Sequence, residues 1–119
     1  MDKNIVKNKS FDFAIRIIKL YQYLQIEKKE YILSKQLLRS GTSVGAMVRE
    51  AEHAESKADF IHKLAIAQKE INETIYWLEL MKATDYLNQT EFETINKDAS
   101  EIIRLITSII KTTKTNLKQ

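Results

Sequence analysis

The chain of 119 residues contains no proline and only two glycines, so almost nothing in it interrupts a helix. In a helix interior, proline costs about 3 kcal/mol and glycine about 1 kcal/mol relative to alanine. A sequence nearly free of both favours long helices. Its apolar fraction of 44%, with 29% charged residues, is typical of a globular protein and too apolar for a disordered one. We therefore expect one all-α domain over residues 1–119.

The clearest helical pattern lies near the C-terminus, where apolar residues recur at steps of three and four with charged residues between them. Thr90 and Glu93 have the spacing of a capping box, in which each side chain satisfies a free backbone N–H of the other. The pattern predicts a helix over about 91–115. Its apolar face comprises Phe92, Ile95, Ala99, Ile102, Ile106 and Ile109.

A second pattern of the same kind precedes it. Ser56 is a suitable N-cap, and Asp59 places a negative charge in the first turn, where the helix dipole favours one. The polar turn that follows is supplied by Asp85, Asn88, Gln89 and Thr90. This pattern predicts a helix over 57–84. Its buried face comprises Phe60, Leu64, Ala67, Ile71, Thr74, Leu78 and Met81.

The N-terminal half predicts two more helices, joined through the polar residues 27–30. Ser10 is the candidate N-cap of the first, whose apolar face comprises Ala14, Ile17, Tyr21 and Leu24. The other spans about 33–54 and places Leu37, Ser40, Val44, Met47, Ala51 and Ala54 on one face. Four helices joined by short loops predict an up-down-up-down four-helix bundle.

The helix over 33–54 carries a second apolar face beside the first. It contains both glycines, Gly41 and Gly45, and these should be compensated by close backbone packing. One interpretation places that packing inside the bundle, and the other places it against a second subunit. Additional apolar residues on the third and fourth helices favour a homo-oligomer, since large exposed apolar patches usually mark interfaces. The candidate interface residues are Leu38, Gly41, Gly45, Val48, Trp77, Ile103 and Ile110.

The sequence offers little for catalysis or metal binding. The absence of cysteine excludes disulfides and thiolate metal sites. Glu50 and His53 have the spacing found in di-iron bundles, and Glu70 and Glu73 could add carboxylates, but a second such motif is missing. Lys63, if partly buried, needs a partner among these glutamates; otherwise its stem lies on the surface. No nucleophile–base pattern or phosphate-binding loop is present, so we expect no enzyme, cofactor, metal or small-molecule substrate.

The net charge of +3 is concentrated at the two ends of the chain. An up-down-up-down bundle brings both termini to one end, so these lysines should gather there and could neutralise phosphates of RNA or DNA. Lysine-rich ends are also often only solvated. The candidate nucleic-acid-binding residues are Lys3, Lys7, Lys9, Arg49, Lys57, Lys111, Lys114 and Lys118. No apolar stretch is long enough for a signal peptide or a membrane-spanning helix, so we expect a cytoplasmic protein without membrane contact.

The middle of the chain carries a dense set of short motifs at 36–46, 49–51, 56–61, 63–67, 69–70, 73–74 and 76–78. In these residues it closely resembles the "four helix bundle protein" family, whose members are encoded in intervening sequences of bacterial 23S ribosomal RNA genes and are often labelled ribosomal proteins. The resemblance covers most of the chain and is strongest over 36–81. One departure is Met47, where the family leads us to expect asparagine.

This resemblance implies a bacterial protein that assembles as a homopentameric ring of four-helix protomers. The related accessory proteins of diversity-generating retroelements share the architecture and bind nucleic acid and a reverse transcriptase through basic surfaces. For the intervening-sequence family itself the resemblance implies no known activity. The expected function is therefore non-catalytic binding of RNA or DNA, with a protein-interaction scaffold as the alternative.

Overall fold

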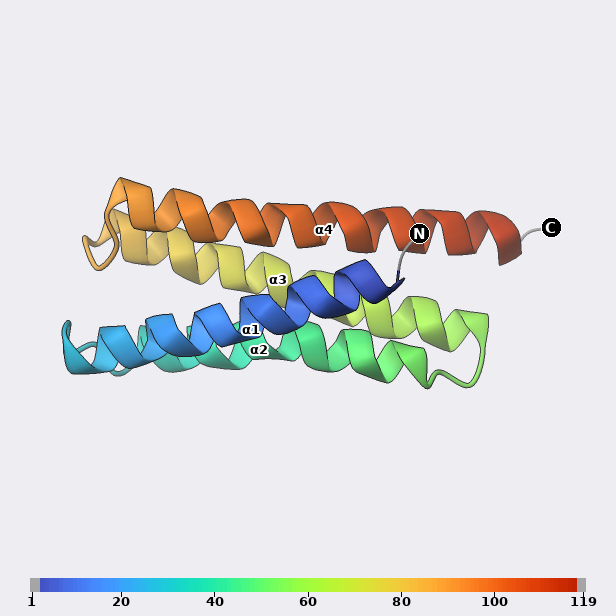
Figure 1. Cartoon of the computed structure of the whole chain (residues 1–119), viewed down its shortest axis with the longest axis horizontal. Helices are drawn as coiled ribbons and strands as arrows, with labels where there is room; N and C mark the ends of the chain where they lie inside the picture. The colour runs from blue at the N-terminus through green and yellow to red at the C-terminus, as the bar shows by residue number, and fades with distance from the viewer. Residues whose placement is uncertain (1–2, 118–119) are drawn as a thin grey trace.

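The computed structural model describes residues 3–117, and of residues 3 and 117 only the backbone. The described residues form four helices: α1 (Lys3–Ile26), α2 (Leu33–Glu52), α3 (Lys57–Ala83) and α4 (Gln89–Leu117). They run alternately up and down, as Figure 1 shows. α1 and α3 each lie beside both α2 and α4, so the four helices form a square in chain order, 52 Å long. The predicted all-α four-helix bundle is confirmed.

The predicted apolar faces of the last two helices are confirmed. In α3, the residues from Leu64 to Met81 that share one face are buried, and Phe60 is partly buried at its start. In α4, every predicted residue from Ile95 to Ile109 is buried, and Phe92 is partly buried. The threonine in the α3 face is satisfied, since Thr74 Oγ1 donates to Ser40 Oγ at 2.9 Å.

Ser10 was wrongly predicted as an N-cap. α1 begins at Lys3, so Ser10 lies two turns inside the helix, where its hydroxyl donates to the carbonyl oxygen of Lys7 at 3.1 Å. Its side chain is buried because α2 crosses at this point. The helix extends upstream because Val6 and Phe13 continue its apolar face and are both buried.

The start of α4 also differs from the prediction. The capping box is formed by Asn88 and Glu91: the Glu91 N–H donates to Asn88 Oδ1, and the Asn88 N–H donates to Glu91 Oε1, both at 2.8 Å. Thr90 lies inside the helix. Asparagine is as good an N-cap as threonine or better, so two overlapping boxes competed and the earlier one formed.

The start of α3 is as predicted, because Ser56 Oγ accepts the N–H of Asp59 at 3.0 Å. α2 begins differently, with a carboxylate from the preceding loop. Glu30 is buried and accepts the N–H groups of Ile32, Leu33 and Ser34 at 2.7–3.1 Å. Burial raises the pKa of Glu30, but these backbone hydrogen bonds outweigh it and hold the pKa below its usual value.

Candidate nucleic-acid interface

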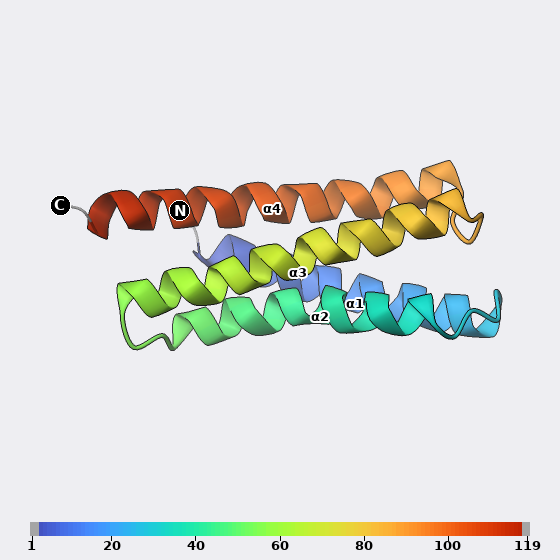
Figure 2. The ribbon, with the colours of Figure 1, turned by 180° about the vertical axis from the view of Figure 1, so that it is seen from behind.

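One end of the bundle is built from the start of α1, the end of α2, the start of α3 and the end of α4. Figures 1 and 2 show both chain ends on this side, with α4 running past the start of α1. The predicted gathering of the N-terminal and C-terminal segments is therefore confirmed. We call this part of the molecule the terminal end.

Two of the candidate lysines at the terminal end are held in ion pairs. Lys7 Nζ lies 3.2 Å from Glu52 on α2, and Lys9 Nζ lies 2.9 Å from Glu101 on α4. The hydrogen bond and charge of Glu101 raise the pKa of Lys9, and Lys9 in turn lowers the pKa of Glu101. Because each charge is already matched, these two lysines contribute less to an anion-binding surface than their sequence positions suggest.

The remaining described candidates keep their positive charge unmatched. Arg49, Lys57, Lys111 and Lys114 are exposed, and none forms an ion pair with a described residue. Lys57 opens α3, whereas Lys111 and Lys114 lie on the last turns of α4. The guanidinium of Arg49 lies over the ring of Phe11, 5.1 Å from its centroid. The side chain of Lys3 and all of Lys118 lie outside the described residues.

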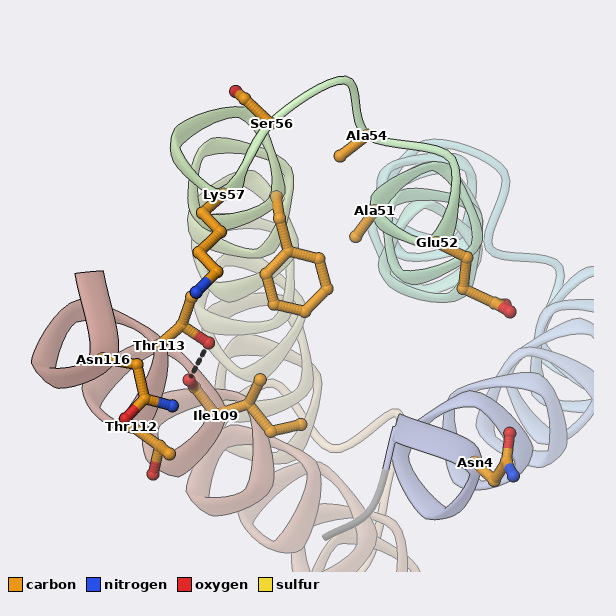
Figure 3. A pocket seen from close by; sticks show the side chains of 11 residues that line it. Asn4, Ala51, Glu52, Ala54, Ser56, Lys57, Ile109, Thr112, Thr113 and Asn116 are labelled. Atoms are coloured by element: carbon orange, nitrogen blue, oxygen red, sulfur yellow. Dashed lines mark hydrogen bonds between the residues drawn. The ribbon is translucent and has the colours of Figure 1, made fainter. Parts of the chain in front are cut away.

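A cleft of about 590 Å³ lies between the four helices at the terminal end. Figure 3 looks into it, with Ala51 and Ala54 on the α2 side, Lys57 at the start of α3, and Asn4 on α1. Thr113 and Asn116 border it from α4, where Thr113 Oγ1 donates to the carbonyl oxygen of Ile109 at 2.8 Å. No sequence pattern predicts this cleft, since it arises from the unequal reach of α1 and α4 at this end.

The predicted second face of α2 packs inside the bundle, which is the first of the two interpretations that the sequence left open. Gly41 lies against Ile17, and Gly45 lies against the backbone of Ser10, so both glycines allow α1 to approach closely. Val48 is 3% exposed. The glycines therefore give no independent support for a second subunit.

Of the other candidate interface residues, three are partly exposed and one is buried. Leu38, Trp77 and Ile103 are half-buried against the core, and Ile110 is 9% exposed. The role of these residues in an oligomer stays a prediction.

An apolar surface that is more exposed than these candidate interface residues, and that was not predicted from the sequence, lies on α1. Phe11, Ile15 and Ile18 share one face of the helix and are 50%, 40% and 41% exposed. We call these three residues the α1 stripe. Their steps of four and three could have revealed it, but the apolar face assigned to this helix did not include them. Further exposed apolar side chains follow in the same part of the chain, namely Ile26, Tyr31 and Ile32.

The carboxylates considered for a metal site are engaged with cations. Glu50 pairs with Lys63 at 3.3 Å, which gives Lys63 one of its predicted partners. Arg39 binds Glu70 at 3.2 Å and also pairs with Glu73. Within residues 3–117 there is no group of three or more His, Cys, Asp or Glu side chains able to hold a metal ion.

The ion pairs of Arg39 with Glu70 and Glu73 join α2 to α3, and the sequence did not predict them. Glu73 also accepts the indole N–H of Trp77 at 3.0 Å. The hydrogen bond from Arg39, followed by that from Trp77, lowers the pKa of Glu73.

In the described part of the chain, no helix has the length and hydropathy needed to cross a membrane.

Comparison with known proteins places the chain in a family. Residues 2–108 match the model of the 23S rRNA-intervening sequence protein family. A solved structure of a protein of unknown function from the S23 ribosomal protein family of Bacteroides thetaiotaomicron is similar, with 58% identity and a TM-score of 0.92. The match covers 93% of this chain and 99% of the solved one. No protein of curated function matches. The chain belongs to the 23S rRNA-intervening sequence protein family.

Proposed function

We propose that this protein is a non-catalytic, cytoplasmic homo-oligomer that binds RNA or DNA through the terminal end. The supporting observation is electrostatic: Arg49, Lys57, Lys111 and Lys114 surround this end without carboxylate partners among the described residues. Phosphate neutralisation by such cations supplies most of non-specific nucleic-acid affinity. We propose that the homo-oligomer is a pentameric ring. Each subunit of such a ring repeats the cationic end, and this repetition strengthens the attraction to a nucleic acid.

Binding of a labelled single-stranded RNA, followed by fluorescence anisotropy at about 50 and 200 mM salt, tests this function. The affinity should fall steeply between the two salt concentrations. The triple variant K57Q/K111Q/K114Q should bind more weakly than the wild type. Its plot of log K against log salt should also be shallower, with a slope about 2 less negative. K19Q/K69Q/K97Q removes the same charge from exposed positions outside the candidate set and should bind nearly as well as the wild type. Absence of binding at about 50 mM salt would remove the proposal.

A protein-interaction scaffold without nucleic-acid binding is the second candidate, because the α1 stripe exposes large apolar side chains. Such surfaces usually mark contacts with other proteins. The same titration separates the two functions, since a pure scaffold shows no salt-dependent affinity for RNA.

A further inference from the structure

The cleft at the terminal end exists because its helices differ in reach. α1 has 24 residues and α4 has 29, and α4 continues past the start of α1 (Figure 2). The last turns of α4 therefore have no α1 backbone opposite them. The small side chains of Ala51, at the end of α2, and Ala54, just after it, do not fill the space. Among the residues that the structure describes, the core is thus open to an occupant at this end.

The lining of the cleft combines an apolar interior with a polar rim. Ala51, Phe60 and Ile109 provide the apolar wall. The amides of Asn4 and Asn116 provide donors and acceptors at the rim (Figure 3). A volume of about 590 Å³ falls within the range typical of small-ligand sites. These features fit a flat ring that is apolar on its faces and hydrogen-bonds at its edges.

The charges around the cleft favour an occupant attached to a phosphate backbone. Glu52 is the one carboxylate in the described lining, and its charge is matched by Lys7. Lys57 lines the cleft directly. Lys111 and Lys114 lie on the other side of α4, because the α4 residues that line the cleft are Ile109, Thr112, Thr113 and Asn116. A base that enters the cleft would leave a flanking phosphate near the ammonium group of Lys57.

We infer that this cleft receives one unpaired base of a single-stranded nucleic acid, with a neighbouring phosphate held by Lys57. This inference rests on the proposed function and assigns it a substrate class. A base paired within a duplex cannot enter, because its edges and faces are occupied by its partner and its stacked neighbours. Asparagine amides pair well with base edges, and apolar and aromatic walls hold a base by its faces.

The test fills the cleft without changing its charge. A54F places a ring in the space beside Ala51, whereas A83F places the same ring at the exposed last residue of α3, at the opposite end of the bundle. A54F should weaken binding of a labelled single-stranded RNA by about five- to a hundredfold, the usual value of one held base, and leave the salt slope unchanged. A83F should bind like the wild type.

Two further measurements test the cleft without relying on A54F, which could misfold. Asn4 and Asn116 are exposed, so N4A/N116A should keep the wild-type circular dichroism spectrum and melting temperature yet bind the same RNA more weakly. Wild-type protein should also prefer a single-stranded DNA oligomer to an abasic oligomer of equal length and charge. The inference is overturned if the abasic oligomer binds equally well, if duplex RNA binds as tightly as the single strand, or if N4A/N116A and A54F bind normally.

The outcomes for the cleft and for the proposed function are distinguishable. Normal binding by A54F and N4A/N116A, together with loss in K57Q/K111Q/K114Q, would overturn the base-binding cleft and retain the electrostatic interface. Absence of wild-type binding at low salt would overturn both.

Discussion

Gly41 and Gly45 are explained by the helix that faces them. A Cβ atom added at Gly41 would lie 2.8 Å from both Cγ atoms of Ile17, and one added at Gly45 would lie 3.2 Å from the carbonyl oxygen of Ser10. Each glycine weakens α2 as a helix by about 1 kcal/mol. The close α1–α2 contact offsets this cost, because dispersion attraction requires atoms to approach to contact distance. Both positions therefore report on packing within one protomer.

Replacing Gly41 tests this packing. G41A should lower the free energy of unfolding by about 1–2 kcal/mol, since the overpacking cost against Ile17 exceeds the gain in helix propensity. In an I17A background the clashing atoms are absent, so the same G41A change should stabilise the protein by up to about 1 kcal/mol. Urea unfolding followed by circular dichroism at fixed protein concentration measures both. Equal effects of G41A in the two backgrounds would contradict the assigned contact.

Trp77 is the single tryptophan of the chain and reports on Glu73. Because Arg39 and Trp77 lower the pKa of Glu73, the emission of Trp77 should change with a midpoint below the ordinary glutamate value of about 4.3. R39Q should move this midpoint upward. E73Q should abolish the transition, and its persistence in E73Q would assign the titration to another group.

The lowered pKa of Glu73 makes the stability of the folded protein depend on pH. The pKa of Glu73 is lower in the folded state than in the unfolded state, so its contribution is present above the unfolded pKa and is lost as the pH falls through the folded pKa. Wild-type protein should therefore exceed R39Q in stability at pH 7, and the difference should vanish in strong acid. A difference in melting temperature that is independent of pH would argue against the ion pair.

At the scale of elements, the free backbone N–H groups at the starts of α2, α3 and α4 are each satisfied by a different side chain. Ser56 caps α3, the pair Asn88 and Glu91 caps α4, and Glu30 in the α1–α2 loop serves α2. The loops after α1 and α3 each contain a residue other than glycine in the left-handed region, Lys29 with φ 56° and Asp85 with φ 69°. The two glycines thus serve helix packing, and the loops turn without them.

The two overlapping capping boxes at α4 make opposite predictions for mutagenesis. N88A should lower the free energy of unfolding by about 1 kcal/mol, because the N–H of Glu91 loses its acceptor. T90A should change it by less than about 0.5 kcal/mol, since Thr90 is an exposed residue within the first turn. Urea denaturation of both variants decides between the boxes. A larger loss in T90A than in N88A would restore the original assignment.

At the scale of the whole molecule, the surface is divided between charged and apolar parts. The α1–α4 side is bridged by ion pairs, with Arg16 bound to Asp98 at 2.6 Å beside the pair of Lys9 and Glu101. The α1 stripe carries exposed apolar side chains on another face of the same helix. If the protein assembles as we propose, burial of this stripe against a second copy would stabilise the assembly.

A charge in the α1 stripe should therefore lower the assembly state. I15E introduces a carboxylate at a 40% exposed position and should reduce the molar mass measured by light scattering while the circular dichroism spectrum is retained. Q89E adds the same charge at an exposed position on another helix, the first residue of α4, and serves as the control. An unchanged mass in I15E would exclude the stripe as an interface, and a monomeric wild type would remove the homo-oligomer altogether.

The sequence alone determined the fold class and most of the core. The apolar spacing of α3 and α4 is long and regular, and it contains no breaker, so the buried faces follow directly from helical geometry. The Ser56 cap was also readable, because its partner Asp59 is three residues away. Such local signals depend only on residues within one or two turns.

The tertiary structure decided everything that depends on which helix lies opposite which. It showed that Gly41 and Gly45 face α1, that Glu52 and Glu101 match two of the candidate lysines, and that Arg39 joins α2 to α3. It also opened the cleft, which depends on how far α4 extends past α1. These contacts join residues far apart in the chain, and periodicity within one helix carries no information on its neighbour's register or length.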